Sequence, residues 1–193
     1  MMKNNNILFA ILGIILFAIL AFVFVSQKAE IPPENITESE ISNFEECIAA
    51  GNPVMESYPR QCRDGDRTFV EKIGNELSKV ELIRIDYPRP NQTINSPFTV
   101  KGEARGTWFF EASFPVELIN RDGHIIAQGI ATAQGEWMTE EFVPFETVLE
   151  FDMQEAHNSK GTLILKKDNP SGLPENDDSL KVPVIIGNVS SES

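Results

Sequence analysis

The sequence contains only two cysteines, Cys47 and Cys62, and only two histidines, His124 and His157. Zinc and haem sites draw mainly on these two residue types, so we expect neither a metal site nor a cofactor. Basic residues are also few, since 16 Lys and Arg stand against 29 Asp and Glu, a net charge of −13. Because nucleic acid is bound through a basic surface, this charge argues against a nucleic-acid partner.

The motifs of the common hydrolases and nucleotide-binding enzymes are also absent. No Gly-x-Ser-x-Gly elbow, His-Glu-x-x-His pair or phosphate-binding P-loop occurs in the sequence. The neighbouring carboxylates Glu45–Glu46 and Glu140–Glu141 do not fit a glycosidase, which needs two carboxylates on opposite sides of a cleft. We therefore predict that the protein is not an enzyme and has no catalytic residues. An envelope hydrolase is the alternative.

One long apolar run is present, at residues 7–25, where 19 consecutive residues carry no charge. As a helix this run would be about 28 Å long, close to the ~30 Å hydrocarbon core of a bilayer. The alternative is a secretory signal peptide, whose apolar region is usually shorter and ends in small residues. Here the run ends with Val23, Phe24 and Val25. We predict an uncleaved, single-pass transmembrane anchor.

The orientation of this anchor follows from the rest of the chain. Lys3 and Lys28 nearly balance on its two sides, so the charges next to it do not decide the orientation. Beyond Lys28 the chain is strongly acidic, with 14 basic against 29 acidic residues, and it carries a cysteine pair at plausible disulfide spacing. Because disulfides persist outside the cytosol, we expect residues 26–193 to be extracytoplasmic at the cell membrane.

Residues 26–38 are polar and contain Pro32–Pro33, as is typical of a stalk. A small module is predicted to follow at residues 39–73, beginning with a short helix. Ser42 would be the N-cap of this helix, with Glu45 completing a capping box. Its buried face is predicted from three apolar residues at helical spacing, Phe44, Cys47 and Ile48. Gly51 would end the helix.

The module is predicted to continue with two short strands, 54–62 and 67–71, joined at an Asp-Gly turn. A disulfide between Cys47 and Cys62 would join the helix to this hairpin, and a module so small needs such a bond. Free thiols and a metal site are the alternatives. Residues 61–69 also resemble part of the core of Kazal-type protease inhibitors, which carry six cysteines. A protease-inhibitor-like module at 39–73 is therefore a second functional alternative.

The main domain is predicted at residues 80–186, with a disordered tail at 187–193. Short runs of alternating apolar residues, separated by turn signals and without a long helix, indicate a mainly β fold, a sandwich of two antiparallel sheets. Seven strands are expected: Val80–Asp86, Phe98–Ala104, Phe114–Asn120, His124–Ala131, Val143–Phe151, Gly161–Lys167 and Leu180–Ile186.

Several segments of this domain resemble the immunoglobulin-like domain of bacterial spore germination. They are Tyr87–Phe98, Gly102–Ala112, Gly135–Trp137, Phe142–Phe145, Asp168–Asp178 and Val182–Val184. The resemblance implies an immunoglobulin-like β-sandwich and an exterior setting, because the family occurs in cell-surface and lipoprotein-like bacterial proteins. It implies no catalytic residues.

Large aromatic residues supply the candidate binding site, at Trp108, Phe109, Phe110 and Trp137. Three consecutive aromatic residues cannot all face one side of a strand, so at least one ring should be exposed or covered by a loop. Alternation singles out Phe109 or the pair that flanks it. In the alternative, Trp108 and Phe110 are core residues and Phe109 packs under a loop. The function predicted is a binding or structural adaptor of the bacterial cell envelope, with an envelope protein or polysaccharide as its partner.

Acidic and amide side chains gather near residues 168–178, including Asp168, Glu175, Asn176, Asp177 and Asp178. Oxygen ligands at short spacing can bind calcium, although their spacing here does not match an EF-hand. The same residues are common in turns. We predict a structural turn, with a calcium site as the alternative.

Overall fold

The computed structural model of this protein describes residues 41–152 and 160–187. The predicted anchor at 7–25 and stalk at 26–38 lie outside these ranges, as do His157 and every residue of the predicted tail except Gly187. Within the described ranges, no helix is long and apolar enough to cross a membrane.

The small module contains one helix and a three-stranded antiparallel sheet. Its elements are α2 (Phe44–Ala49), β1 (Val54–Met55), β2 (Gln61–Asp64) and β3 (Arg67–Val70), and the strand order is β1-β2-β3. The helix and the hairpin agree with the sequence prediction. The segment 54–62, predicted as one strand, is divided into β1 and β2. Gly65, in the turn between β2 and β3, has φ of +57°, which glycine adopts at little cost.

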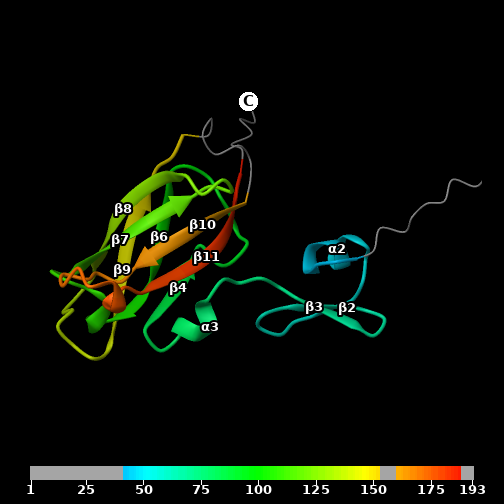
Figure 1. The fold of residues 1–193 in the computed structure, drawn as a ribbon, viewed down its shortest axis with the longest axis horizontal. Helices are drawn as coiled ribbons and strands as arrows, with labels where there is room; N and C mark the ends of the chain where they lie inside the picture. The colour runs from blue at the N-terminus through cyan, green and yellow to red at the C-terminus, as the bar shows by residue number, and fades with distance from the viewer. Residues whose placement is uncertain (1–40, 153–159, 188–193) are drawn as a thin grey trace, which may run out of the picture. The chain divides into compact units, whose positions relative to one another are not determined.

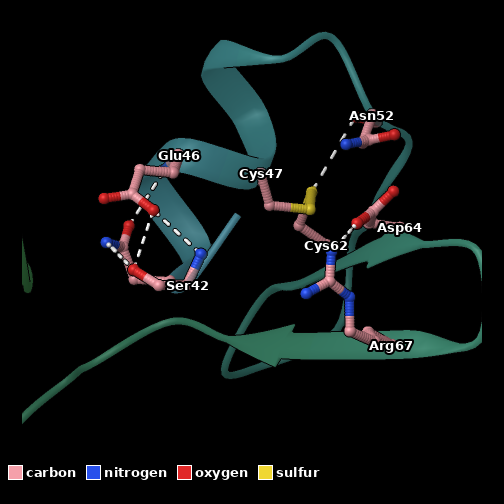
Figure 2. The surroundings of a disulfide bond; sticks show 8 residues. Ser42, Glu46, Cys47, Asn52, Cys62, Asp64 and Arg67 are labelled. Atoms are coloured by element: carbon pink, nitrogen blue, oxygen red, sulfur yellow. Dashed lines mark hydrogen bonds and ion pairs between the residues drawn. A yellow bond between two sulfur atoms is a disulfide. The ribbon is translucent and has the colours of Figure 1, made fainter. Parts of the chain in front are cut away.

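Helix α2 begins one residue later than predicted. Its N-cap is Asn43, whose side-chain oxygen accepts a hydrogen bond of 2.9 Å from the Glu46 N–H. The Glu46 carboxylate in turn accepts hydrogen bonds of 2.8 Å from both the backbone N–H and the hydroxyl of Ser42 (Figure 2). The backbone hydrogen bond from Ser42 is the main reason that the pKa of Glu46 is lowered. Ile48, predicted on the buried face, is exposed.

The predicted disulfide joins Cys47 of α2 to Cys62 of β2, with 6.0 Å between the two Cα atoms (Figure 2). Both cysteine side chains are completely buried. The buried cluster of this module has only three members, Phe44, Cys47 and Cys62, with Ile41, Val54 and Phe69 packed against it. The disulfide therefore lies at the centre of a very small core.

The main domain contains all seven predicted strands, and their ends differ from the prediction by at most three residues. The strands are β4 (Ile83–Tyr87), β6 (Phe98–Arg105), β7 (Ser113–Ile119), β8 (Ile125–Ala133), β9 (Phe142–Leu149), β10 (Lys160–Lys166) and β11 (Ser179–Ile186). A two-residue strand that was not predicted, β5 (Thr93–Ile94), pairs in parallel with the end of β11.

These eight strands form one sheet rather than the two separate sheets predicted. Their order is β4-β6-β9-β8-β7-β10-β11-β5. The two halves of the sheet are joined between β8 and β9, where only Thr132↔Glu146 and Ala133↔Phe145 pair. The sheet is curled (Figure 1), and its inward side chains form one core. The largest completely buried members are Trp108, Phe114, Phe145, Ile83, Ile85, Ile94, Leu118, Leu149, Leu163, Leu165, Leu180 and Ile186.

A one-turn helix, α3 (Glu76–Lys79), precedes β4 and was not predicted. The residues before it are bound to β11. Asn75 accepts a hydrogen bond of 2.7 Å from the Lys181 N–H and donates one of 2.9 Å to the Ser179 carbonyl. A Cβ on Gly74 would lie 1.8 Å from the Lys181 carbonyl oxygen, so only glycine fits at this close approach. The chain between the small module and β4 is therefore held against β11.

The size of the core around Cys47 and Cys62 predicts how the small module responds to loss of the disulfide. Cys47→Ser combined with Cys62→Ser should lower the stability of the module by about 3 kcal/mol, because the bond closes a loop of 15 residues. Limited proteolysis should then cut within residues 41–70, while the strands from β4 to β11 stay protected, since they have a separate core. Equal protection of the small module in the variant and the wild type would contradict this.

Candidate functional site

The aromatic run is not a strand, which changes which of its rings are exposed. A short 3₁₀ helix, η1 (Gly106–Trp108), follows β6 directly. Phe110 and Ser113 then exchange backbone hydrogen bonds of 3.0 and 3.1 Å around a two-residue turn. Both residues in that turn have positive φ, +50° for Glu111 and +62° for Ala112. These are backbone conformations that non-glycine residues seldom adopt, and they are typical of a tight hairpin turn of type I′.

As a result, two consecutive rings are buried and the third is exposed. Trp108 is 1% exposed, Phe109 5% and Phe110 41%. The prediction that strand alternation would expose Phe109, or the pair that flanks it, is wrong because side chains alternate only in a strand. The alternative was right that Trp108 belongs to the core and wrong about Phe110. Phe110 alone of these three rings can meet a partner.

Trp137, the fourth candidate, is half-buried and packs against the main core. Its loop lies close to Gly106, where a Cβ would be 2.2 Å from the Trp137 carbonyl oxygen. The Arg105 guanidinium donates a hydrogen bond of 2.9 Å to the Glu140 carbonyl and holds the end of this loop. Met138, beside Trp137, is 73% exposed. A surface hollow is lined here by Gly106, Thr107, Phe109, Trp137, Met138, Thr139 and Glu140.

The acidic segment after β10 is organised by hydrogen bonds within the protein. The Asp177 carboxylate accepts a hydrogen bond of 2.7 Å from the Asn169 side chain. Asp178 lies 2.6 Å from the Lys79 ammonium and also accepts from the Ser179 N–H. A 3₁₀ helix, η2 (Pro174–Asn176), occupies the middle of the segment. In the described part of the chain, no group of three His, Cys, Asp or Glu side chains is placed to hold a metal ion.

Two buried carboxylates lie where the small module meets the main domain, and the sequence analysis did not identify either of them. The first is Glu71, directly after β3. Arg60 binds it through two hydrogen bonds, of 2.9 and 2.7 Å, and Asn91 donates a third of 3.1 Å. The hydrogen bonds from Arg60 lower the pKa of Glu71 below its usual range. The carboxylate form is thus the one that the fold stabilises.

The second buried carboxylate is Glu76, at the start of α3. Its Oε1 lies 2.9 Å from the Arg89 guanidinium, and its Oε2 contacts the Tyr58 hydroxyl. Burial nevertheless dominates and raises the pKa of Glu76, with Arg89 offsetting only part of the effect. A pocket of about 240 Å³ opens beside this pair. It is lined by Tyr58, Glu76, Leu77, Val80, Ile83, Arg84, Ile85, Asp86 and Arg89.

The burial of Trp108 and Phe109 and the exposure of Phe110 predict two different costs of replacing these rings by alanine. Trp108→Ala and Phe109→Ala should each lower the free energy of unfolding by about 3–5 kcal/mol, as for large core aromatic residues. Phe110→Ala should change it by less than about 1 kcal/mol, as for surface residues. Denaturant melts of the three variants measure these differences. A loss of several kcal/mol in Phe110→Ala would show that its ring is a core group and not a binding group.

The two buried carboxylates should respond in opposite ways to neutralisation. The lowered pKa of Glu71 means that its contribution to stability is present above its ordinary pKa and is lost as the pH falls through the folded value. Glu71→Gln should therefore cost about 1–2 kcal/mol at pH 7, a modest figure because Arg60 is half-exposed. The raised pKa of Glu76 means that stability is lost as the pH rises through it.

Glu76→Gln should consequently leave stability at pH 7 equal to or above that of the wild type. It serves as the matched control, since both variants replace a buried carboxylate that is paired with an arginine. Denaturant melts between pH 4 and pH 7 measure both variants. A larger loss at pH 7 in Glu76→Gln than in Glu71→Gln would reverse the assignment of these two carboxylates.

Comparison with known proteins adds one finding. The curated proteins and the solved structures contain no match to this chain. Residues 82–172 match the family model described as the immunoglobulin-like domain of bacterial spore germination. The match covers β4 to β10 together with the aromatic run and the Trp137 loop. The match confirms, for residues 82–172, the resemblance seen in the sequence to the immunoglobulin-like domain of bacterial spore germination.

Proposed function

We propose that this protein is a non-catalytic binding or structural adaptor of the bacterial cell envelope. In this proposal a single transmembrane helix at residues 7–25 anchors it in the cell membrane, and residues 26–193 lie outside the cytoplasm. The immunoglobulin-like domain then presents a binding surface to an envelope protein or a polysaccharide. The family of residues 82–172 supports this role, because an immunoglobulin-like domain is a scaffold for recognition.

The observation that carries the proposal is the buried disulfide between Cys47 and Cys62. In a reducing cytosol thiols stay reduced, whereas disulfides persist in the cell exterior. This bond lies at the centre of the small module and uses every cysteine in the chain. The module would therefore keep its disulfide in an exterior location. The 19-residue apolar run that precedes the module would serve for export and for attachment to the membrane.

The surface beside Trp137 is the candidate contact region of the adaptor. Met138 is exposed in this region, and the half-buried Trp137 lines the same surface hollow. Phe110, at the end of the aromatic run, is a second exposed aromatic side chain of the matched residues. Exposed Trp, Phe and Met side chains are typical of binding surfaces, because they bury much apolar area on contact.

A topology experiment tests the proposal directly. In the Cys47→Ser, Cys62→Ser background, Asp122→Cys introduces the chain's single thiol in the exposed turn between β7 and β8. A membrane-impermeant maleimide should label this thiol in intact cells, and the protein should remain in the membrane fraction after an alkaline wash. The matched control places the thiol at Asn5, before the apolar run, where labelling should require lysis.

Two results would overturn the proposed topology. Labelling at position 122 only after lysis would place the domain inside the cell, and labelled protein in the medium would show that the apolar run does not anchor it.

A further inference from the structure

Three connections of the main domain meet at one end of the sheet, where β11 begins (Figure 1). They are residues 106–112 between β6 and β7, residues 134–141 between β8 and β9, and residues 167–178 between β10 and β11. The Asp168 N–H donates a hydrogen bond of 3.1 Å to the Trp108 carbonyl, and the Ala133 N–H donates one of 2.9 Å to the Ala112 carbonyl. In the immunoglobulin fold, loops gathered at one end form the binding surface of variable domains. This end therefore has the topology of a recognition surface.

The hollow beside Trp137 lies at this end, between the first two connections, and has a volume of about 460 Å³. Phe109, Trp137 and Met138 give it an apolar lining, and Met138 is 73% exposed. Its hydrogen-bonding side chains are few, since they are two threonine hydroxyls and the Glu140 carboxylate. The hollow is thus suited to an apolar side chain of a partner rather than to a group with many hydroxyls.

The loop that forms one wall of the hollow is ordered by its own hydrogen bonds. The Met138 N–H donates to the Glu136 carboxylate at 3.0 Å, and the Thr139 N–H donates to the Trp137 carbonyl at 2.8 Å. The Thr139 hydroxyl oxygen accepts from the Glu141 N–H at 3.2 Å. Because the loop is already ordered, binding loses little conformational entropy.

The charge of this loop is negative. Residues 134–141 carry three exposed glutamates, and the sequence contains no Lys or Arg from residue 122 to residue 159: Glu136, Glu140 and Glu141. Arg105 reaches the loop through the Glu140 carbonyl, but its guanidinium pairs with Glu81 at 4.0 Å and lies over the Phe142 ring, 4.1 Å from its centre. The three glutamates are therefore not balanced by this arginine.

The third connection adds to the negative charge of the same end. Residues 167–178 contain four carboxylates and one lysine, Lys167. The neighbouring lysines are already paired, since Lys79 lies 2.6 Å from Asp178 and Lys166 lies 2.6 Å from Glu117. A cationic partner is attracted to such a surface, whereas a polymer that carries phosphate or carboxylate groups is repelled.

We infer that the hollow beside Trp137 binds a basic segment of a partner polypeptide. An apolar side chain of this segment fills the hollow against Met138, and lysine or arginine side chains on either side of it face the glutamates of residues 134–141. A second copy of this chain would bring the same negative charge to the surface. The inference rests on the contact region of the proposed function and names its partner class.

The test uses the full chain in a non-ionic detergent, with a capped hexapeptide of alternating lysine and leucine as the probe. Affinity is measured by fluorescence anisotropy of the labelled peptide. A glutamate–leucine hexapeptide and a lysine–serine hexapeptide should each bind at least about 10-fold more weakly, the first for its charge and the second because it leaves the hollow empty. Raising the salt concentration from 0.05 M to 0.5 M should also weaken binding of the lysine–leucine peptide by about 10-fold.

Tryptophan fluorescence locates the bound peptide. The chain has two tryptophans, and Trp108 is only 1% exposed, so acrylamide quenches mainly the half-buried Trp137. Saturating lysine–leucine peptide should lower the acrylamide quenching constant by about 2-fold, because it covers the hollow that Trp137 lines.

Two pairs of matched variants separate charge from apolar contact. Glu140→Lys should weaken binding of the lysine–leucine peptide by about 10-fold, whereas Asp122→Lys, in the exposed turn at the other end of β7 and β8, should leave it within about 2-fold. Met138→Ala should weaken binding by about 5-fold, whereas Ile125→Ala, which shortens an exposed side chain beside that distant turn, should leave it within about 2-fold. Thermal melts check that all four variants are folded.

Absence of binding, equal binding of the glutamate peptide, equal weakening in a variant and its control, or binding without protection of Trp137 would each overturn the inference. Protection of Trp137 by a hexamer of N-acetylglucosamine, but not by the lysine–leucine peptide, would assign the hollow to a polysaccharide. The partner class would then be wrong while the contact region stands. Protection by neither probe would remove the contact region itself. None of these results depends on where the protein lies in the cell, so the inference and the proposed topology can fail separately.

Discussion

The curled eight-stranded sheet closes around one core, and most features of the main domain depend on that packing. Inward side chains of the strands form most of this core, and residues just beyond the strands complete it. Trp108 and Phe109 fill it from the end of β6, and the tight turn at Glu111 and Ala112 brings the chain back into β7. The two backbone hydrogen bonds between Phe110 and Ser113 close this turn around its two residues of positive φ.

The small module depends on a different balance of forces. Its apolar core is too small to offset the ordering of about 30 residues, so a covalent bond and the Arg60–Glu71 pair add to it. Glu71 and Glu76 lie five residues apart, yet burial raises the pKa of one while Arg60 lowers the pKa of the other. The difference arises because Glu71 receives three hydrogen bonds, whereas the pairing of Glu76 with Arg89 only partly offsets the cost of burial.

The candidate contact region combines exposed apolar side chains with ordered backbone. At Trp137 the loop is held by the Arg105 hydrogen bond and by its close approach to Gly106. Rigid backbone with exposed apolar rims binds at a lower entropic cost than a flexible loop does.

The seven main strands, the helix–hairpin module and the disulfide were all predictable, because they depend on local alternation, turn residues and the spacing of two cysteines. The exposure of Phe110 was not predictable, because it depends on a backbone turn at Glu111 and Ala112. This turn contains no glycine, the residue that usually marks positive φ in a sequence. The pairing that joins the two halves of the sheet was not predictable either. The same holds for the two arginine–glutamate pairs, in which the arginine and the glutamate lie 11 and 13 residues apart in the chain. Sequence alone determined which segments are strands, because a residue's neighbours decide its local conformation. Only the tertiary structure decided which aromatic rings, carboxylates and strand edges are buried, because burial depends on segments that meet in space.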